Sequence, residues 1–267
     1  MSAFVKSLLS ILAALLATAS AALANGDGFP FQVGERLTYR IYWGPLIAGE
    51  ASLEVAGIEA VNGHDCYHLL AKAQTSGLVD LLFHVDSTTE SWLDTKQLCT
   101  RRYRQNRVEG KRAKRCETIY DYDHGRYTIT NQISGAQHVF PLDKPLQDIV
   151  SAFYYLRTQL FQLDEPRSFT VNAGDTNRLV RVTPDQRKNI WTNPLGEIPA
   201  LRVEPNPTIT VVSANKGRMW IWISDDAQRI PLVLITTMKI GSARFQLTEV
   251  QTTNPALAKR LRPVTKD

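Results

Sequence analysis

The sequence lacks the residue patterns of most metal, redox and nucleotide sites. Only three of its 267 residues are cysteines, and their spacing excludes a Cys-x-x-Cys redox motif. Gly-rich phosphate loops and the Cys and His spacings of zinc sites are also absent. No stretch rich in Gly, Ser or Pro divides the chain, so we expect one β domain over residues 25–253, with no cofactor and no metal.

The small number of cysteines also restricts the disulfides. Cys99 and Cys116 would lie on two arms of a hairpin turning at Glu109-Gly110, offset by about four residues, or roughly 13 Å along the strand. That separation is too long for a disulfide. Cys66 with Cys99 is the better pair if their strands are neighbours, and three buried free thiols are the alternative.

The first 24 residues have the pattern of a secretory signal peptide. Lys6 is their only charged residue, an apolar stretch runs from Leu8 to Leu16, and Ala22-Leu23-Ala24 has the small-x-small form that signal peptidase cleaves. An uncleaved anchor is the alternative, but the apolar run is marginal for a membrane span. We therefore expect a periplasmic protein that begins at Asn25.

Charge is nearly balanced, with 31 basic and 26 acidic side chains and a net charge of +5. Without Lys6 the net charge is +4. Such a mild excess suits an anionic envelope surface but does not imply nucleic acid, which the secretory route also disfavours.

Alternating apolar and polar residues predict that most of the chain forms β-strands. Residues 35–43, for example, place Leu37, Tyr39 and Trp43 on one face. Further strands are predicted at residues 49–58, 67–73, 82–93, 101–108, 117–122, 126–133, 168–171, 178–183, 188–192, 200–205, 218–223, 232–238 and 243–251.

One segment, residues 148–161, has helical spacing instead, and Ile149, Phe153, Leu156 and Leu160 form its apolar face. The pattern predicts a mainly β fold: a single large curved antiparallel sheet or incomplete barrel of roughly twelve to fourteen strands, with this helix plugging or covering it. Residues 254–267 are expected to form a loose basic tail.

A series of short motifs spans nearly the whole exported chain. It consists of residues 31–39 (FQVGERLTY), 43–44 (WG), 48–49 (AG), 90–92 (ESW), 148–157 (DIVSAFYYLR), 222–226 (WISDD), 229–231 (RIP) and 239–242 (KIGS). In order and type the series resembles a bacterial family of exported proteins of unknown function, DUF3108. The resemblance implies an envelope β protein and no catalytic residue.

The hairpin at Glu109-Gly110 carries eight basic side chains within fifteen residues. Arginine and lysine bind phosphate and carboxylate groups, so an anionic headgroup is one expected ligand. We place it at Arg102, Arg104, Arg112 and Lys114, provided that the two strand faces coincide. A solvated hairpin whose charges protect a sheet edge is the alternative.

Five aromatic residues are candidates for the lining of the curved sheet, namely Tyr39, Trp43, Trp92, Trp220 and Trp222. A half-open barrel with an aromatic interior and a basic rim suits a carrier of hydrophobic anions. Ordinary core packing is the alternative for most of them.

Catalytic groupings are weak. Asp225-Asp226 fits a turn better than an acid–base pair. His64 and His68 lie roughly 13 Å apart if both are on a strand, too far for one metal. His84 and Asp86 share a strand face, but no nucleophilic Ser in a Gly-rich elbow accompanies them.

The leading hypothesis is therefore a non-enzymatic envelope protein that binds a lipid or another hydrophobic anion in its curved sheet, with an anionic lipid or envelope polymer as partner and peripheral membrane contact. The alternative is an interaction module that binds partner proteins through exposed edge strands. A third reading, an envelope hydrolase, lacks a visible nucleophile.

Overall fold

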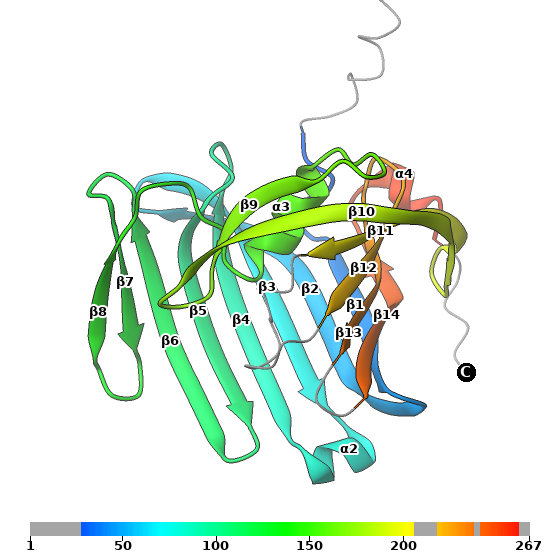
Figure 1. Cartoon of the computed structure of the whole chain (residues 1–267), viewed down its shortest axis with the longest axis horizontal. Helices are drawn as coiled ribbons and strands as arrows, with labels where there is room; N and C mark the ends of the chain where they lie inside the picture. Colours follow the sequence, from blue (N-terminus) through cyan, green and yellow to red (C-terminus); the bar gives the residue numbers. More distant parts are fainter. Residues whose placement is uncertain (1–27, 206–217, 238–240, 262–267) are drawn as a thin grey trace, which may run out of the picture.

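The structure is a computed structural model that describes residues 28–205, 218–237 and 241–261. Fourteen antiparallel strands form one curved sheet, accompanied by short helices, which confirms the predicted fold class (Figure 1). The elements are β1 (Arg36–Trp43), β2 (Leu46–Val61), β3 (His64–Thr75), α2 (Gly77–Leu82), β4 (Val85–Asp94), β5 (Thr100–Glu109), β6 (Arg112–Asp121), β7 (Arg126–Asn131), β8 (Gln137–Pro141), α3 (Ser151–Thr158), β9 (Arg167–Asn172), β10 (Asn177–Thr192), β11 (Gly196–Pro205), β12 (Met219–Ser224), β13 (Pro231–Thr237), β14 (Ser242–Gln251) and α4 (Pro255–Ala258).

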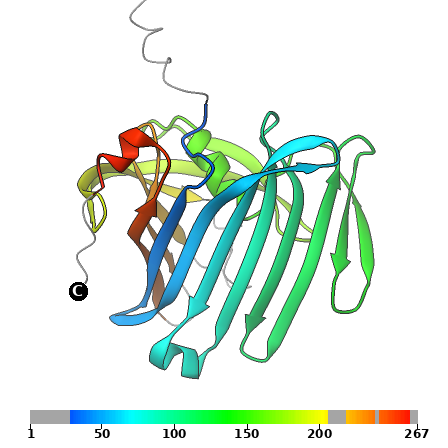
Figure 2. The same cartoon turned by 180° about the vertical axis from the view of Figure 1, so that it is seen from behind.

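The sheet is a meander that begins and ends at its centre. Its order is β8-β7-β6-β5-β4-β3-β2-β1-β14-β13-β12-β11-β10-β9, so β1 and β14 pair with each other (Figure 2). The two edge strands, β8 and β9, are joined by the segment that contains α3. The chain thus crosses from one edge to the other only once.

The sheet curls but does not close into a barrel. Gln147 lies between its two halves: it pairs with Val171 of β9, next to the point where Thr100 of β5 donates to the carbonyl of Leu146. The Tyr120 hydroxyl of β6 also donates to Asn172 of β9 over 3.0 Å. The incomplete barrel is therefore held by a short segment and side chains rather than by strand pairing.

Helix α3 lies inside the curl, packed against both halves of the sheet. It is shorter than the predicted helix at residues 148–161, and its buried side chains differ from the predicted face. Leu156 is buried as expected, but Leu160 lies beyond the helix end and is 71% exposed. Tyr154 and Arg157 are fully buried instead. An apolar periodicity could not identify a buried arginine.

Asp148 explains where α3 begins. One of its carboxylate oxygens accepts hydrogen bonds from the backbone N–H groups of Val150 and Ser151, at 2.7 and 3.0 Å. The other accepts from the hydroxyls of Ser91 in β4 and Thr100 in β5, at 2.5 and 2.9 Å. Asp148 therefore caps the helix and attaches it to two strands.

Arg157 anchors the other end of α3. Its guanidinium forms a buried two-point ion pair with Glu35, at 2.5 and 2.9 Å. It also donates to the carbonyls of Pro30 and Gln228. One side chain thus joins α3 to the segment before β1 and to the turn before β13.

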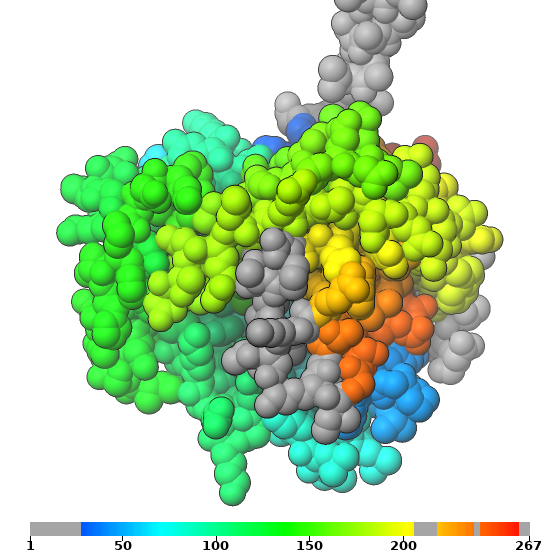
Figure 3. Space-filling model, viewed as in Figure 1, coloured from blue at the N-terminus to red at the C-terminus, as the bar shows by residue number. Residues whose placement is uncertain are grey.

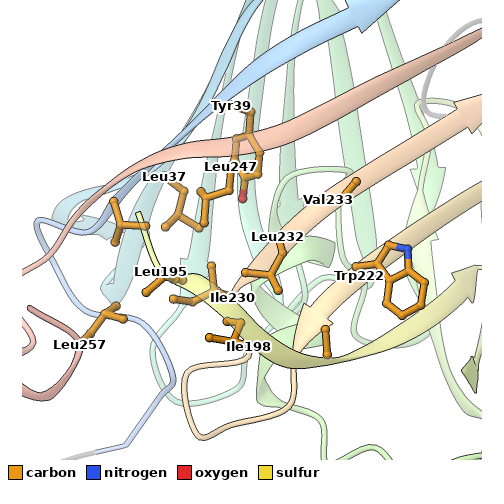
Figure 4. Packing of buried hydrophobic residues seen from close by; sticks show 12 residues of the cluster. Leu37, Tyr39, Leu195, Ile198, Trp222, Ile230, Leu232, Val233, Leu247 and Leu257 are labelled. Atoms are coloured by element: carbon orange, nitrogen blue, oxygen red, sulfur yellow. The ribbon is translucent and has the colours of Figure 1, made fainter. Parts of the chain in front are cut away.

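The largest hydrophobic cluster joins β1 and β11–β14 to the C-terminal segment. Leu37, Leu232 and Leu247 meet Leu257 of α4 in it (Figure 4). Residues 254–261 therefore do not form the predicted loose tail: Asn254 caps α4, and Leu257 is buried. Residues 262–267 and the predicted signal peptide at residues 1–24 lie outside the described residues.

Another difference from the predicted strands concerns residues 77–84. A strand was expected from Leu82, but Gly77–Leu82 forms α2, and β4 begins at Val85. The Asp80 carboxylate accepts from Thr75 and pairs with His84, which closes this turn locally. Local hydrogen bonding thus outweighs the apolar run.

Replacing one partner of the buried ion pair should strongly destabilise the fold. We expect Arg157→Met to lower the free energy of unfolding by about 3–5 kcal/mol, because Glu35 keeps a buried charge without a partner. Arg157→Met/Glu35→Gln should recover part of this loss in urea titrations. Arg187→Met breaks a half-exposed pair with Asp225 and should change stability by less than about 1 kcal/mol. If Arg157→Met and Arg187→Met lost equal amounts of stability, the Arg157–Glu35 pair would not be a buried anchor of the fold.

Asp148 makes stability depend on pH. Burial raises the pKa of its carboxyl above 3.8, although hydrogen bonds from Ser91, Ser151, Val150 and Thr100 oppose this. As pH rises above 3.8, the unfolded chain releases the proton first, so the free energy of unfolding falls until the folded pKa is passed. Urea titrations should show the parent losing up to about 1.4 kcal/mol per pH unit relative to Asp148→Asn in this range. If the parent instead gained stability relative to Asp148→Asn as pH rises, the hydrogen bonds to the carboxylate would outweigh the effect of burial on its pKa.

Candidate ligand site on the concave face

The side of the sheet that faces α3 is its concave face, and the atoms of β9 and β10 (yellow-green) cross its upper part in Figure 3. Residues directly opposite each other in antiparallel strands share a face, so the registers identify its members. One cross-strand row follows Tyr39, Ala51, Ala73, Ser87, Arg107 and Lys114. A second follows Gly49, Ile41, Phe245, Leu234, Ile221 and Val203.

A part of this face beyond α3 is apolar and only partly covered. We call it the concave trough, and its members, all partly exposed, are Ile41, Ala51, Leu53, Ala71, Ala73, Leu234 and Phe245. Their neighbours nearer to α3, such as Val55 and Leu69, are fully buried by Val150 and Tyr154. The helix therefore buries the side chains next to it, whereas the trough residues keep part of their surface exposed.

A small apolar pocket lies beside the trough. It is lined by Ile149, Ala152, Phe153, Leu156, Phe169, Val171, Val180, Val182, Pro205, Met219 and Ile221. Its volume is about 40 Å³, far below the roughly 300–1,000 Å³ of a typical ligand pocket. Phe153 therefore borders a pocket that is too small for a typical ligand.

Basic side chains lie at the margin of the same face. Arg107 and Lys114 are directly opposite each other, and Glu109 is opposite Arg112. Arg107 forms an ion pair of 3.0 Å with Glu109, whereas no acidic partner contacts Lys114 or Arg112 among the described residues. The local charge is thus positive next to the apolar trough.

Arg102 and Arg104 do not join this group, so the four predicted headgroup residues do not converge. Both lie on the convex face, over the ring of Trp92 at 4.7 and 5.5 Å. Arg102 pairs with Glu117, and Arg104 pairs with Glu90 and Glu117. Their charges are neutralised within the sheet.

The turn of the β5–β6 hairpin explains this separation. Only Gly110 and Lys111 connect the strands, so even-numbered residues of one strand oppose odd-numbered residues of the other. Arg112 and Lys114 therefore share a face with Arg107, and not with Arg102 or Arg104. The odd-even rule for a two-residue turn was the signal that could have identified Arg107.

The aromatic candidates also divide between the two faces. Tyr39 and Trp43 lie on the concave face, where the Tyr39 hydroxyl donates to the carbonyl of Pro231. Trp92, Trp220 and Trp222 lie on the convex face, opposite the side chains that meet α3. Three of the five predicted lining residues therefore do not face α3, and Trp222 packs into the largest hydrophobic cluster instead.

The candidate acid–base residues have structural partners. His84 bonds to Asp80 rather than to Asp86. Asp226 accepts from Ser224 and from the N–H groups of Gln228 and Arg229, as a turn residue does. Among the described residues, no group of three His, Cys, Asp or Glu side chains could hold a metal ion, and no helix is long and apolar enough to cross a membrane.

The fold and this face define an open, curved antiparallel sheet with an internal helix and no recognisable catalytic grouping among the described residues. The chain belongs to the family of proteins of unknown function DUF3108, whose model matches residues 38–248. The family resemblance that the short motifs of the sequence indicated is thereby confirmed.

Two solved structures are similar to this chain. One is a β-barrel-like protein of the domain of unknown function DUF1849 from Brucella abortus, with a TM-score of 0.53 and 12% identity over 84% of this chain and 99% of that chain. The other, from Bacteroides fragilis, is described as exported and as having a YmcC-like fold, with a TM-score of 0.32 and 12% identity over 83% and 97%. No curated protein matches. The similarity to the Brucella abortus protein supports the fold of this chain and nothing about its function.

The three cysteines are free and buried, so Cys66 and Cys99 do not form the disulfide that the sequence favoured. Burial raises the pKa of the Cys66 thiol to about 12, and it also raises the pKa values of Cys99 and Cys116. Thiols in this state are poor nucleophiles. They act as small core residues.

Thiol titration should distinguish the two predicted cysteine states. We expect almost no reaction of the native protein with a thiol reagent within minutes, because the thiols are buried and protonated. All three should react in guanidinium chloride without reductant. If only one reacted there, Cys66 and Cys99 would be bonded.

Proposed function

We propose that this protein binds the hydrocarbon part of an amphipathic anion, such as a fatty acid or lipid, in the concave trough. It acts by binding rather than by catalysis, and it works outside the cytoplasm, as the pattern of residues 1–24 suggests. One observation carries the proposal. The row through Ala51, Ala73, Ser87, Arg107 and Lys114 changes from apolar to cationic along a single face.

The apolar part of this row consists of small side chains. Ala51, Ala71 and Ala73 are small, and each keeps part of its surface exposed, although the neighbouring Tyr39 is fully packed. Covering such a surface with a hydrocarbon chain is favourable by about 25 cal/mol per Å² of apolar area. An acyl chain can lie along the trough without entering the small pocket beside α3.

The cationic end supports an anionic headgroup. Like charges directly opposite each other on a sheet destabilise it, so Arg107 and Lys114 repel when no anion is present. Glu109 compensates only one of the three basic side chains on this face. A carboxylate or phosphate bound between Arg107 and Lys114 would remove the repulsion and gain charge-assisted hydrogen bonds.

Strand addition at a sheet edge is less well supported. Strand β8 has five residues and ends at Pro141, and short edges with proline resist pairing. The outer side of β9 is occupied by Gln147, which exchanges hydrogen bonds with Thr170 and Asn172. Neither edge offers a long free strand within the described residues.

Displacement of a fluorescent fatty acid by oleate tests the proposal. We expect Arg107→Gln/Lys114→Gln to weaken oleate binding about tenfold or more, since two charge-assisted contacts are lost. Ala73→Phe should abolish binding by filling the trough. Arg102→Gln/Arg104→Gln removes the same charge from the convex face and should leave the affinity unchanged.

Thermal melting of each variant controls for folding. If oleate did not displace the fluorescent fatty acid from the parent protein, the proposal would be contradicted. Equal weakening by the two double variants would also contradict it, because binding would then follow net charge rather than the position of the charges.

A further inference from the structure

Large apolar side chains are exposed together at the open end of the sheet. We define the apolar tip as Leu46, Ile47, Leu78, Leu81, Leu82 and Phe83, from the start of β2, from α2 and from the residue after α2. Leu78, Leu81 and Leu82 are 71%, 83% and 76% exposed. Only Val79 of α2 is buried, so this helix covers little of the core.

The tip is one surface rather than scattered residues. The N–H of Ser76, just before α2, donates to the carbonyl of Ala48 over 2.9 Å, which places α2 beside Ile47. In Figures 1 and 2, α2 and the β1–β2 turn project from the same end of the sheet. Soluble proteins seldom expose large contiguous apolar patches without a partner.

Basic side chains border the tip. The N–H of Gly110 donates to the carbonyl of His84 over 2.7 Å, so the β5–β6 turn is attached directly to the end of α2. Lys111, Arg112, Lys114 and Arg115 are exposed around this turn. Two of the nearby acids are engaged, since Asp80 bonds to Thr75 and His84, and Glu109 pairs with Arg107. The other two, Glu50 and Asp86, are exposed and fewer than the four basic side chains.

We propose that the apolar tip and the basic turn together form a docking surface for an anionic lipid bilayer. Protruding leucine and phenylalanine side chains insert among acyl chains, while adjacent lysines and arginines attract anionic headgroups. The tip projects from hairpin ends, and basic side chains outnumber acidic ones beside it. Docking in this way would turn the open end of the concave trough toward the membrane.

This surface shares Lys114 with the ligand site proposed above, but the variants that test the two proposals change different residues. Leu81 and Leu82 lie outside the trough, and Lys111 and Arg115 are neither Arg107 nor Lys114. Failure of one proposal therefore leaves the other intact.

Flotation with vesicles tests docking, with one part phosphatidylglycerol to three parts phosphatidylcholine, or with phosphatidylcholine alone. The parent should float with the anionic vesicles, and less so as salt rises. We expect Leu81→Ser/Leu82→Ser and Lys111→Gln/Arg115→Gln each to reduce the bound fraction about fivefold or more. Their matched controls, Leu160→Ser/Leu179→Ser and Arg178→Gln/Arg181→Gln, change exposed residues elsewhere and should bind like the parent.

A probe at the tip adds a direct measurement. Because the natural thiols are buried, a polarity-sensitive dye on Leu82→Cys should shift to shorter wavelength with anionic vesicles, and a dye on Leu160→Cys should not. Leu81→Ser/Leu82→Ser should still bind oleate. No flotation of the parent would overturn the proposal, as would equal losses in the controls. It would also be overturned if Leu81→Ser/Leu82→Ser only converted a dimer into a monomer, since the tip would then bind a second copy.

Discussion

The buried ion pair between Arg157 and Glu35 is the constraint on which the rest of the structure depends. A sheet that curls without closing cannot position its two halves by strand pairing alone. The ion pair ties α3 to the segment before β1, and Asp148 ties the start of the same helix to β4 and β5. Two polar anchors at opposite ends of one short helix therefore set the curvature, and the apolar side chains between them fill the space.

The position of α3 also divides the concave face into two regions of different chemistry. Near the helix, large side chains such as Leu69 and Ile221 are buried against it. Away from the helix, alanines leave space, and polar residues replace apolar ones from β4 to β6. On the convex face, by contrast, Arg102 and Arg104 cover Trp92 and pair with glutamates. Arg104 and Arg107, only three positions apart in sequence, therefore lie on opposite faces and have different roles.

Strand alternation was sufficient to predict the strands of the sheet, and helical spacing the central helix, because both depend on apolar periodicity. It failed where the deciding contact was polar or distant. The burial of Arg157 follows from Glu35, which lies 122 positions away. Trp92 has the periodicity of a core residue, but the carboxylate of Glu59 and the ring of His68 hold it on the convex face. Among the headgroup residues, Arg107 was missed because its face depends on the number of residues in one turn.

The pairing of β1 with β14 has a consequence for how the chain folds. The strands β1–β8 form one run of consecutive hairpins and β9–β14 form another, so each half can develop from local contacts. The seam between them joins residues more than 190 positions apart, such as Trp43 and Ala243. Pairing of such distant strands is slow, because the chain loses conformational entropy before the new contacts stabilise it. Until the seam forms, β1 and β14 are unpaired edges with apolar residues. The slowest and most aggregation-prone stage of folding therefore lies at the centre of the finished sheet rather than at its rim.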